Sequence, residues 1–193
     1  MARACLLVLM QPSPTLEEEF NDWYDTDHVP ERLAVPGFLA ARRYVCQSGW
    51  PAYLVIYDLR DLATLATPDY LRVAEGKYTP WTRRILARVR ARRDAVVCCG
   101  PDDGVTSDAP HLLLIRFTGA GEAARGALLE RLRTLRENHP EVATVRLLAI
   151  DGDPASYYAA IEARSPLPPG AVSAAFFAQL APSIDLWNCY ARR

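Results

Sequence analysis

The sequence predicts an α+β protein in which two ferredoxin-like βαββαβ units lie on one chain and pack sheet to sheet. Two observations support this prediction. Apolar runs and amphipathic segments follow the order strand, helix, strand, strand, helix, strand, and the order then occurs a second time. A polar, turn-rich segment at residues 101–110 lies near the middle of the 193-residue chain. We therefore expect one unit at residues 1–102 and another at residues 109–193.

The composition is typical of a soluble globular protein, with 50% hydrophobic and 23% charged residues. The 22 basic and 23 acidic residues leave a net charge of −1, which argues against nucleic-acid binding because phosphates attract a basic excess. No apolar run reaches the ~18 residues of a membrane-spanning helix, and the run at residues 4–10 is too short for a secretory signal. We expect a cytoplasmic protein with no nucleic-acid or membrane partner.

Four apolar runs bounded by turn residues predict the strands of each unit. The expected strands are residues 6–10, 38–46, 52–59, 95–99, 111–117, 142–150, 157–163 and 184–190. Helices are expected to begin at Thr67-Pro68 and Thr79-Pro80, because Thr suits the N-cap and Pro the first helical position. The arginine-rich residues 83–93 are interpreted as the solvated face of the second of these helices. The second unit is expected to have an amphipathic helix at residues 122–136 and a short helix around residues 171–180.

The first helix follows the turn at residues 11–14 and has the strongest local signal. Thr15 and Glu18 form a capping-box pattern, and apolar residues then recur at helical spacing. Pro30 disfavours helical geometry in the residue before it. The helix is therefore expected to end just before Pro30, with His28 at its C-terminus.

The densest group of polar and aromatic residues is WYDTDHVPER at residues 23–32. Two packed units would enclose a cavity lined by strand side chains and by the ends of the first helices, and this segment would face it. His28 could then move a proton, with Asp25 or Asp27 orienting its ring and Tyr24 donating a hydrogen bond. Alternatively, the aromatic residues belong to the core, the aspartates are solvated and His28 only caps the helix. Spacing alone leaves both interpretations open.

The same segment resembles the EthD-like branch of the dimeric α/β-barrel superfamily. The pattern of Trp-Tyr, three residues, His, one residue and Pro is matched by Trp23, Tyr24, His28 and Pro30, and VPGF at residues 35–38 and ARRY at residues 41–44 follow it. Further matches are Tyr70, Thr79, Trp81 and Arg83, where such proteins tend to carry an aromatic residue and a Thr-x-Trp element. The second unit keeps only a faint echo, Asn138-His139-Pro140, and is interpreted as a degenerate repeat that completes the barrel.

The resemblance implies a dimeric α/β barrel made by one chain, acting as a monomer or as a homodimer, with a site for a small aromatic or polyketide-like molecule. His28 is expected to be the general acid–base in cyclisation, isomerisation, dehydration or decarboxylation through an enolate. The expected catalytic residues are His28, Asp25, Asp27 and Tyr24. The expected substrate-binding residues are Trp23, Tyr44, Tyr57 and Trp81.

The superfamily does not share one reaction, so two alternatives stay open. One is a cofactor-free monooxygenase, in which the protein deprotonates a phenolic substrate and the substrate supplies the electrons to oxygen. The other is a non-catalytic protein that binds a small molecule or haem. Oxygen uptake would indicate the monooxygenase. The absence of any turnover would indicate the non-catalytic binding protein.

Metal and cofactor motifs are not found in the sequence. The five cysteines are odd in number and lie in or beside apolar, strand-like runs, which predicts buried free thiols (Cys5, Cys46, Cys98, Cys99 and Cys189). His111 and His139 lie far from His28 along the chain and have no metal-ligand spacing. The sequence also contains no Gly-x-Gly-x-x-Gly, Walker-type, Gly-x-Ser-x-Gly or His-Glu-x-x-His motif. We therefore expect an enzyme that uses neither a metal nor a cofactor.

Overall fold

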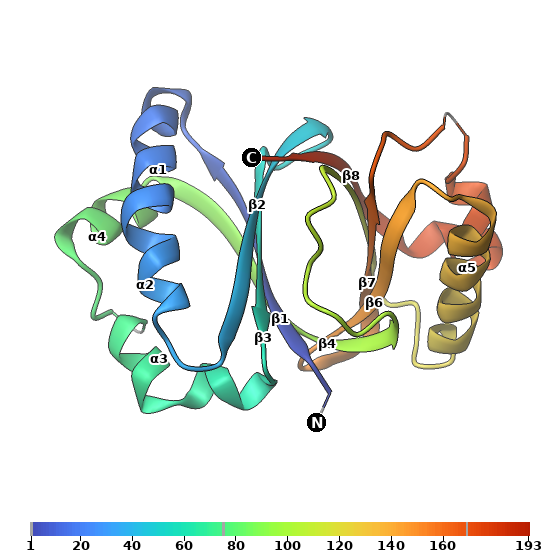
Figure 1. Cartoon of the computed structure of the whole chain (residues 1–193), viewed down its shortest axis with the longest axis horizontal. Coiled ribbons are helices and arrows are strands. Elements are labelled where there is room, and N and C mark those ends of the chain that lie inside the picture. The colour runs from blue at the N-terminus through green and yellow to red at the C-terminus, as the bar shows by residue number, and fades with distance from the viewer. Residues whose placement is uncertain (1, 75, 169) are drawn as a thin grey trace.

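The computed structural model describes residues 2–74, 76–168 and 170–193, and its centre is a closed barrel of eight antiparallel strands (Figure 1). The order round the barrel is β1-β3-β2-β8-β5-β7-β6-β4. The strands are β1 (Ala4–Pro12), β2 (Phe38–Ser48), β3 (Tyr53–Leu59), β4 (Val89–Pro101), β5 (His111–Phe117), β6 (Val142–Ile150), β7 (Asp153–Ala163) and β8 (Ile184–Arg192). Helices cover two opposite sides of the barrel, which confirms the predicted α+β class.

The strands of each half of the chain follow the same spatial order. One sheet is β4-β1-β3-β2 and the other is β8-β5-β7-β6. The two sheets join where β2 pairs with β8 and where β4 pairs with β6. Because both edges of each sheet are paired in this way, a single chain closes the barrel.

The helices are α1 (Glu17–Trp23), α2 (Val29–Leu33), α3 (Pro68–Val73), α4 (Pro80–Leu86) and α5 (Ala124–Asn138), with 3-10 turns at Pro14–Leu16, Leu62–Ala66 and Ala174–Ser183. Two predicted N-caps are confirmed, because Thr67 and Thr79 each accept a hydrogen bond from the backbone N–H three residues later. The capping box at Thr15 is wrong. Within the described chain no side chain caps α1, because the preceding 3-10 turn runs directly into it.

The first helix does not end at His28. Tyr24–His28 is a π-helical turn that joins α1 to α2, so the chain stays helical over residues 17–33. Pro30 lies in the first turn of α2, where its missing N–H is tolerated. The predicted helix end was wrong because the wider π turn rearranges the backbone hydrogen bonds before Pro30. Single π turns of this kind are frequent at functional sites.

The arginine-rich segment is helical only at its start, because Arg83 and Arg84 lie in α4, whereas Arg90, Arg92 and Arg93 lie in a strand. α4 ends at Leu86, and β4 begins at Val89 instead of residue 95. The register with β1 runs from the pair Pro12 and Val89 to the pair Ala4 and Val97. Long-range pairing with a buried strand therefore overrides the local helical pattern in this segment.

Alternate residues of β1 face two different cores. Leu6 and Met10 pack toward α1–α4, whereas Leu7 and Leu9 pack into the barrel interior. The interior core also contains buried aromatic side chains such as Tyr44. The barrel thus has an apolar inner core, and each sheet has a second core beneath its helices.

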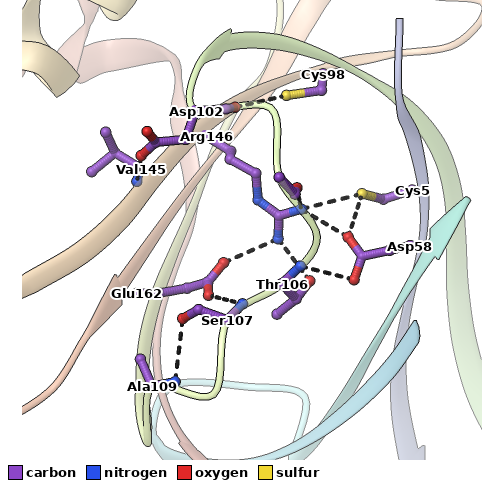
Figure 2. A network of polar contacts seen from close by, with 11 residues as sticks. Cys5, Asp58, Cys98, Asp102, Thr106, Ser107, Ala109, Val145, Arg146 and Glu162 are labelled. Atoms are coloured by element: carbon purple, nitrogen blue, oxygen red, sulfur yellow. Dashed lines mark hydrogen bonds and ion pairs between the residues drawn. The ribbon is translucent and has the colours of Figure 1, made fainter. Parts of the chain in front are cut away.

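The linker between the two halves runs through the barrel and is fixed there by a buried charge cluster (Figure 2). Arg146, 2% exposed, donates hydrogen bonds to Asp58 Oδ1 at 2.8 Å and to Glu162 Oε1 at 3.0 Å. The same two carboxylates accept hydrogen bonds from the backbone N–H groups of Thr106 at 3.0 Å and Ser107 at 2.6 Å. The linker, the charge cluster and the apolar core fill much of the space between the sheets. A cavity of about 270 Å³ remains at strands of both sheets, with Leu9, Arg116 and Leu186 in its wall, but the segment at residues 23–32 does not line it.

Two further expectations concern the whole chain. In the part of the chain that the structure describes, no helix is long and apolar enough to cross a membrane. All five cysteines are free, but only Cys5 is buried, and Cys189 is exposed. The prediction of buried thiols is thus confirmed for Cys5 and wrong for Cys189, whose strand lies at the seam between the two sheets.

Candidate active site

A cavity of about 170 Å³ lies between the first helical region and the outer face of β1 and β4. Its wall combines aliphatic and aromatic side chains with one imidazole and two guanidinium groups. The lining residues are Leu6, Val8, Met10, Trp23, Tyr24, His28, Arg32, Tyr57, Tyr70, Tyr78, Leu86, Ala91 and Arg93. Four of the predicted site residues, Trp23, Tyr24, His28 and Tyr57, therefore meet in one cavity.

The π turn holds two aromatic rings against His28. The imidazole stacks on Trp23, with ring centroids 4.3 Å apart and 28° between the planes, and Tyr24 meets it edge-on at 5.2 Å. Side chains five residues apart are not neighbours on a regular α-helix, whereas a π turn places its hydrogen bonds between residues i and i+5. His28 is 9% exposed as a result.

The imidazole of His28 is neutral at physiological pH. Burial, together with the positive charges of Arg32 and Arg93, lowers the pKa of His28 to about 3. Its Nδ1 atom is buried and has no hydrogen-bond partner within the described chain. A neutral imidazole keeps one ring nitrogen as an acceptor, so it can take a hydrogen bond or a proton from a bound molecule.

The carboxylate beside the ring belongs to Glu31, not to an aspartate. Glu31 Oε2 lies 3.9 Å from His28 Nδ1, about one helical turn away along α2. Asp25 forms an ion pair with Arg43 on β2, and Asp27 accepts a hydrogen bond from a hydroxyl of α4 at 3.4 Å. The prediction that Asp25 or Asp27 orients the ring is therefore wrong, because the π turn directs both aspartates toward other partners.

The tyrosines of the wall are hydrogen-bond donors at neutral pH. Tyr24 donates to the sulfur of Met10 at 3.2 Å. Burial raises the pKa of Tyr24 and of Tyr57 above the usual tyrosine value, so both hydroxyls keep their protons. Since Tyr24 uses its proton on Met10, Tyr57 is the one of the two that is placed to donate a hydrogen bond to a molecule in the cavity.

Two predicted substrate-binding residues lie elsewhere. Tyr44 packs into the barrel interior, on the opposite face of the sheet from the cavity. Trp81 is half-buried, and its Nε1–H donates to Glu19 Oε1 on α1 at 3.0 Å. Among the described residues that line the cavity, neither Tyr44 nor Trp81 is present. The predicted substrate-binding role is therefore not supported for these two side chains.

Sequence reasoning missed Arg32 and Arg93. Their guanidinium carbons each lie 5.7 Å from the ring centroid of Tyr70, and Arg93 donates a hydrogen bond to the Tyr70 hydroxyl. Arg32 follows His28 by four residues, a spacing that indicates one helical face only if the helix continues past Pro30. Arg93 pairs with Val8 across the sheet, so its place on the cavity face follows from a strand that the local pattern did not predict.

A larger cavity of about 460 Å³ lies over the second half of the chain. Its wall is mostly apolar and includes Leu113, Ile161 and Trp187, together with His111. No Asp, Glu, Lys or Arg is present among the described residues that line it. We place the candidate site at His28, because acid–base, hydroxyl and cationic groups converge only at the smaller of these two cavities.

The residues around His28 do not fit a haem. Pockets for drug-sized ligands occupy roughly 300–1,000 Å³, and the cavity of about 170 Å³ is too small for the macrocycle. Elsewhere in the described residues, no three His, Cys, Asp or Glu side chains gather in a way that could hold a metal ion.

Solved structures resemble this one along the whole chain. A "putative monooxygenase" from Lactobacillus acidophilus has a TM-score of 0.61 and 10% identity, with 100% of this chain and 94% of that chain covered. A chlorite dismutase mutant from Candidatus Nitrospira defluvii, in complex with cyanide, has a TM-score of 0.63 and 11% identity, with 99% and 90% covered. An anthrone oxidase-like protein has a TM-score of 0.58 and 11% identity, with 100% and 91% covered.

No protein-family model matches the sequence, and no curated protein matches it significantly. At identities of 8–13% the structural matches show the fold alone. The chain therefore has the same overall fold as these structures.

Proposed function

We propose that the protein is a cofactor-independent enzyme in which His28 removes a proton from a small phenolic or enolisable substrate. The observation that carries the proposal is a neutral imidazole in the wall of a cavity, next to the hydroxyls of Tyr24 and Tyr57. General bases work best when they are unprotonated and their pKa lies near the working pH. His28 is unprotonated at neutral pH, and a bound anion that offsets the charges of Arg32 and Arg93 would raise its pKa toward that range.

The proposed step transfers one proton from a phenolic O–H, or from a C–H beside a carbonyl, to the imidazole. The substrate keeps the electron pair as a phenolate or enolate, and Tyr57 donates a hydrogen bond to the developing oxyanion. The imidazolium then returns the proton to a different atom. Return to carbon completes an isomerisation, and return to a departing hydroxyl completes a dehydration. In a cyclisation the enolate carbon first attacks a carbonyl carbon of the same substrate, and the proton returns to the alkoxide that forms there. Glu31 stabilises the imidazolium from the Nδ1 side.

A second candidate is oxygenation of a phenolic substrate, favoured by the likeness to the Lactobacillus acidophilus and anthrone oxidase-like proteins. It begins with the same deprotonation. The substrate anion then reduces molecular oxygen, and the resulting hydroperoxide loses water. One oxygen atom enters the product as a carbonyl and the other leaves as water, so the substrate supplies all the electrons.

The test compares the wild type with His28→Gln and with His139→Gln, a matched histidine change in the second half of the chain. Each protein is incubated in air with phenols and β-dicarbonyl compounds, and the products are followed by mass spectrometry and oxygen uptake. Turnover by the wild type and His139→Gln, but not by His28→Gln, supports the proposal. An unchanged or dehydrated mass indicates proton transfer, whereas oxygen gain indicates the second candidate. Equal turnover by all three proteins excludes His28 as the base. Binding of a compound without turnover by any of them would indicate a carrier protein instead of an enzyme.

We also infer that the chain consists of two ferredoxin-like units, at residues 1–102 and 109–193, and acts as a monomer. The matching strand order of the two sheets and the closure of the barrel within one chain support this inference. The pattern formed by Trp23, Tyr24, His28 and Pro30 supports an EthD-like first unit. Light scattering should give a mass close to 21.5 kDa, and a mass of twice that value would indicate a homodimer.

A further inference from the structure

We propose that the substrate of this site is a single-ring aromatic acid whose carboxylate binds between Arg32 and Arg93. The inference rests on the proposed function and narrows it to one class of substrate. It is argued from an incompletely hydrogen-bonded buried cation, from the charge of the cavity wall and from the cavity volume.

Arg32 is a buried cation whose hydrogen bonds are incomplete. It is 5% exposed, and its buried Nη1 atom has no hydrogen-bond partner in the described residues. Glu31 Oε2 lies 3.7 Å from Nη1, beyond the length of a hydrogen bond. A buried charge without hydrogen bonds is costly, so a ligand oxygen that reaches Nη1 is stabilised there.

The cavity wall has an excess of positive charge. Arg93 enters from β4, opposite α2, and donates to the Tyr70 hydroxyl, so both guanidinium groups lie beside the same ring. The described lining residues include these two arginines and no carboxylate. Apolar walls strengthen the attraction of such a pair for an anion. Arginine also matches the two oxygens of a carboxylate in geometry.

The volume limits the ligand to one ring. A cavity of ~150 Å³ in another protein holds benzene, and this cavity measures about 170 Å³. The aliphatic side chains of Leu6 and Met10 and the aromatic wall at Tyr57 suit the ring. A fused polyketide skeleton does not fit in this volume.

Binding of a carboxylate also increases the basicity of His28. The charged and titratable groups near the ring are Tyr24, Glu31 and Arg32 from the helical region and Arg93 from β4. A bound anion offsets the two arginine charges that lower the pKa of His28. The same contact that selects an acid therefore strengthens the base.

The test measures calorimetric binding of benzoate and of benzamide, which have nearly the same shape and differ in charge. The proteins are the wild type, Arg32→Gln, Arg93→Gln and the control Arg72→Gln, whose side chain is 67% exposed and pairs with Asp69. We expect the wild type and Arg72→Gln to bind benzoate at least about tenfold more tightly than benzamide. Arg32→Gln and Arg93→Gln should each lose this preference. If Arg32→Gln does not fold, the inference is tested by Arg93→Gln alone, because Arg93 lies on an exposed part of β4.

Equal affinity of the wild type for the two probes, no benzoate binding, or a preference retained in both cavity variants would overturn the inference. The outcome is separable from that of the proposed function. If benzoate binds as expected but His28→Gln turns over substrate like the wild type, the carboxylate-binding site is supported and His28 is excluded as the base. If turnover depends on His28 but both probes bind equally, the role of His28 as the base is supported and the aromatic acid is excluded as the substrate class.

Discussion

The imidazole of His28 stacks on the indole of Trp23, with ring centroids 4.3 Å apart. The Nε1–H of this indole, which belongs to α1, donates a hydrogen bond of 3.0 Å to the hydroxyl of Thr82 on α4. Trp23 is fully buried, so its position depends on this hydrogen bond and on the packing around it. α4 therefore helps to position the proposed base through Trp23.

Thr82→Val should destabilise the protein. The change keeps the shape of the side chain but leaves the buried Trp23 N–H without an acceptor, which costs about 1–3 kcal/mol. Urea unfolding measures this loss, with the exposed Thr118→Val as the control. A loss no larger than that of the control would show that the hydrogen bond does not fix the indole.

The lowered pKa of His28 predicts that stability falls in acid. An unfolded histidine titrates near pH ~6.5, whereas His28 in the folded protein titrates at about 3. Between these values the unfolded chain binds the extra proton, so the free energy of unfolding decreases as the pH falls. His28→Gln lacks this effect. From pH 7 to pH 4.5, the wild type should lose about 2.5 kcal/mol more than the variant. A difference between them that does not change with pH would contradict the lowered pKa.

Arg146→Met should be strongly destabilising. The change leaves the buried carboxylates of Asp58 and Glu162 without their shared cation, at a cost of about 3–5 kcal/mol. Neutralising all three groups, with Asp58→Asn and Glu162→Gln added, should recover a large part of the loss. Chemical unfolding tests both changes against the exposed control Arg133→Met. Failure of the triple variant to recover stability would mean that the charges are not the cause.

Glu31→Gln and Asp25→Asn should differ in their effects on turnover. Loss of the Glu31 charge removes a partner of the imidazolium and should lower kcat by about tenfold, or ~1.4 kcal/mol. Asp25 pairs with Arg43 instead, so Asp25→Asn should leave kcat within about twofold. Steady-state kinetics, measured on the first compound that the wild type turns over, compares kcat of the two variants. The reverse order of effects would restore Asp25 as the orienting group.

Local sequence signals predicted the parts of the fold that depend on local chemistry. The threonine N-caps at Thr67 and Thr79 and the alternation of strands with helices follow from short-range hydrogen bonding and apolar periodicity. Trp23, Tyr24 and His28 were found because they form one continuous segment.

Other features depend on contacts between distant parts of the chain. The π turn at Tyr24–His28 has no local signature, and Pro30 indicated a helix end instead. Arg93 reached the cavity because β1 pairs with a segment that has a helical pattern. The linker was expected as a boundary between units, and its path through the barrel depends on Arg146, which lies 40 residues after Thr106.

The most direct test of the central claim is the rate at which His28→Gln turns over the first compound that the wild type consumes. If His28 is the base, the variant should lose at least about 100-fold in kcat, while His139→Gln keeps the wild-type rate. Circular dichroism shows whether the variants are folded. A folded His28→Gln protein with the wild-type rate would contradict the account, because the imidazole would then have no part in the chemistry.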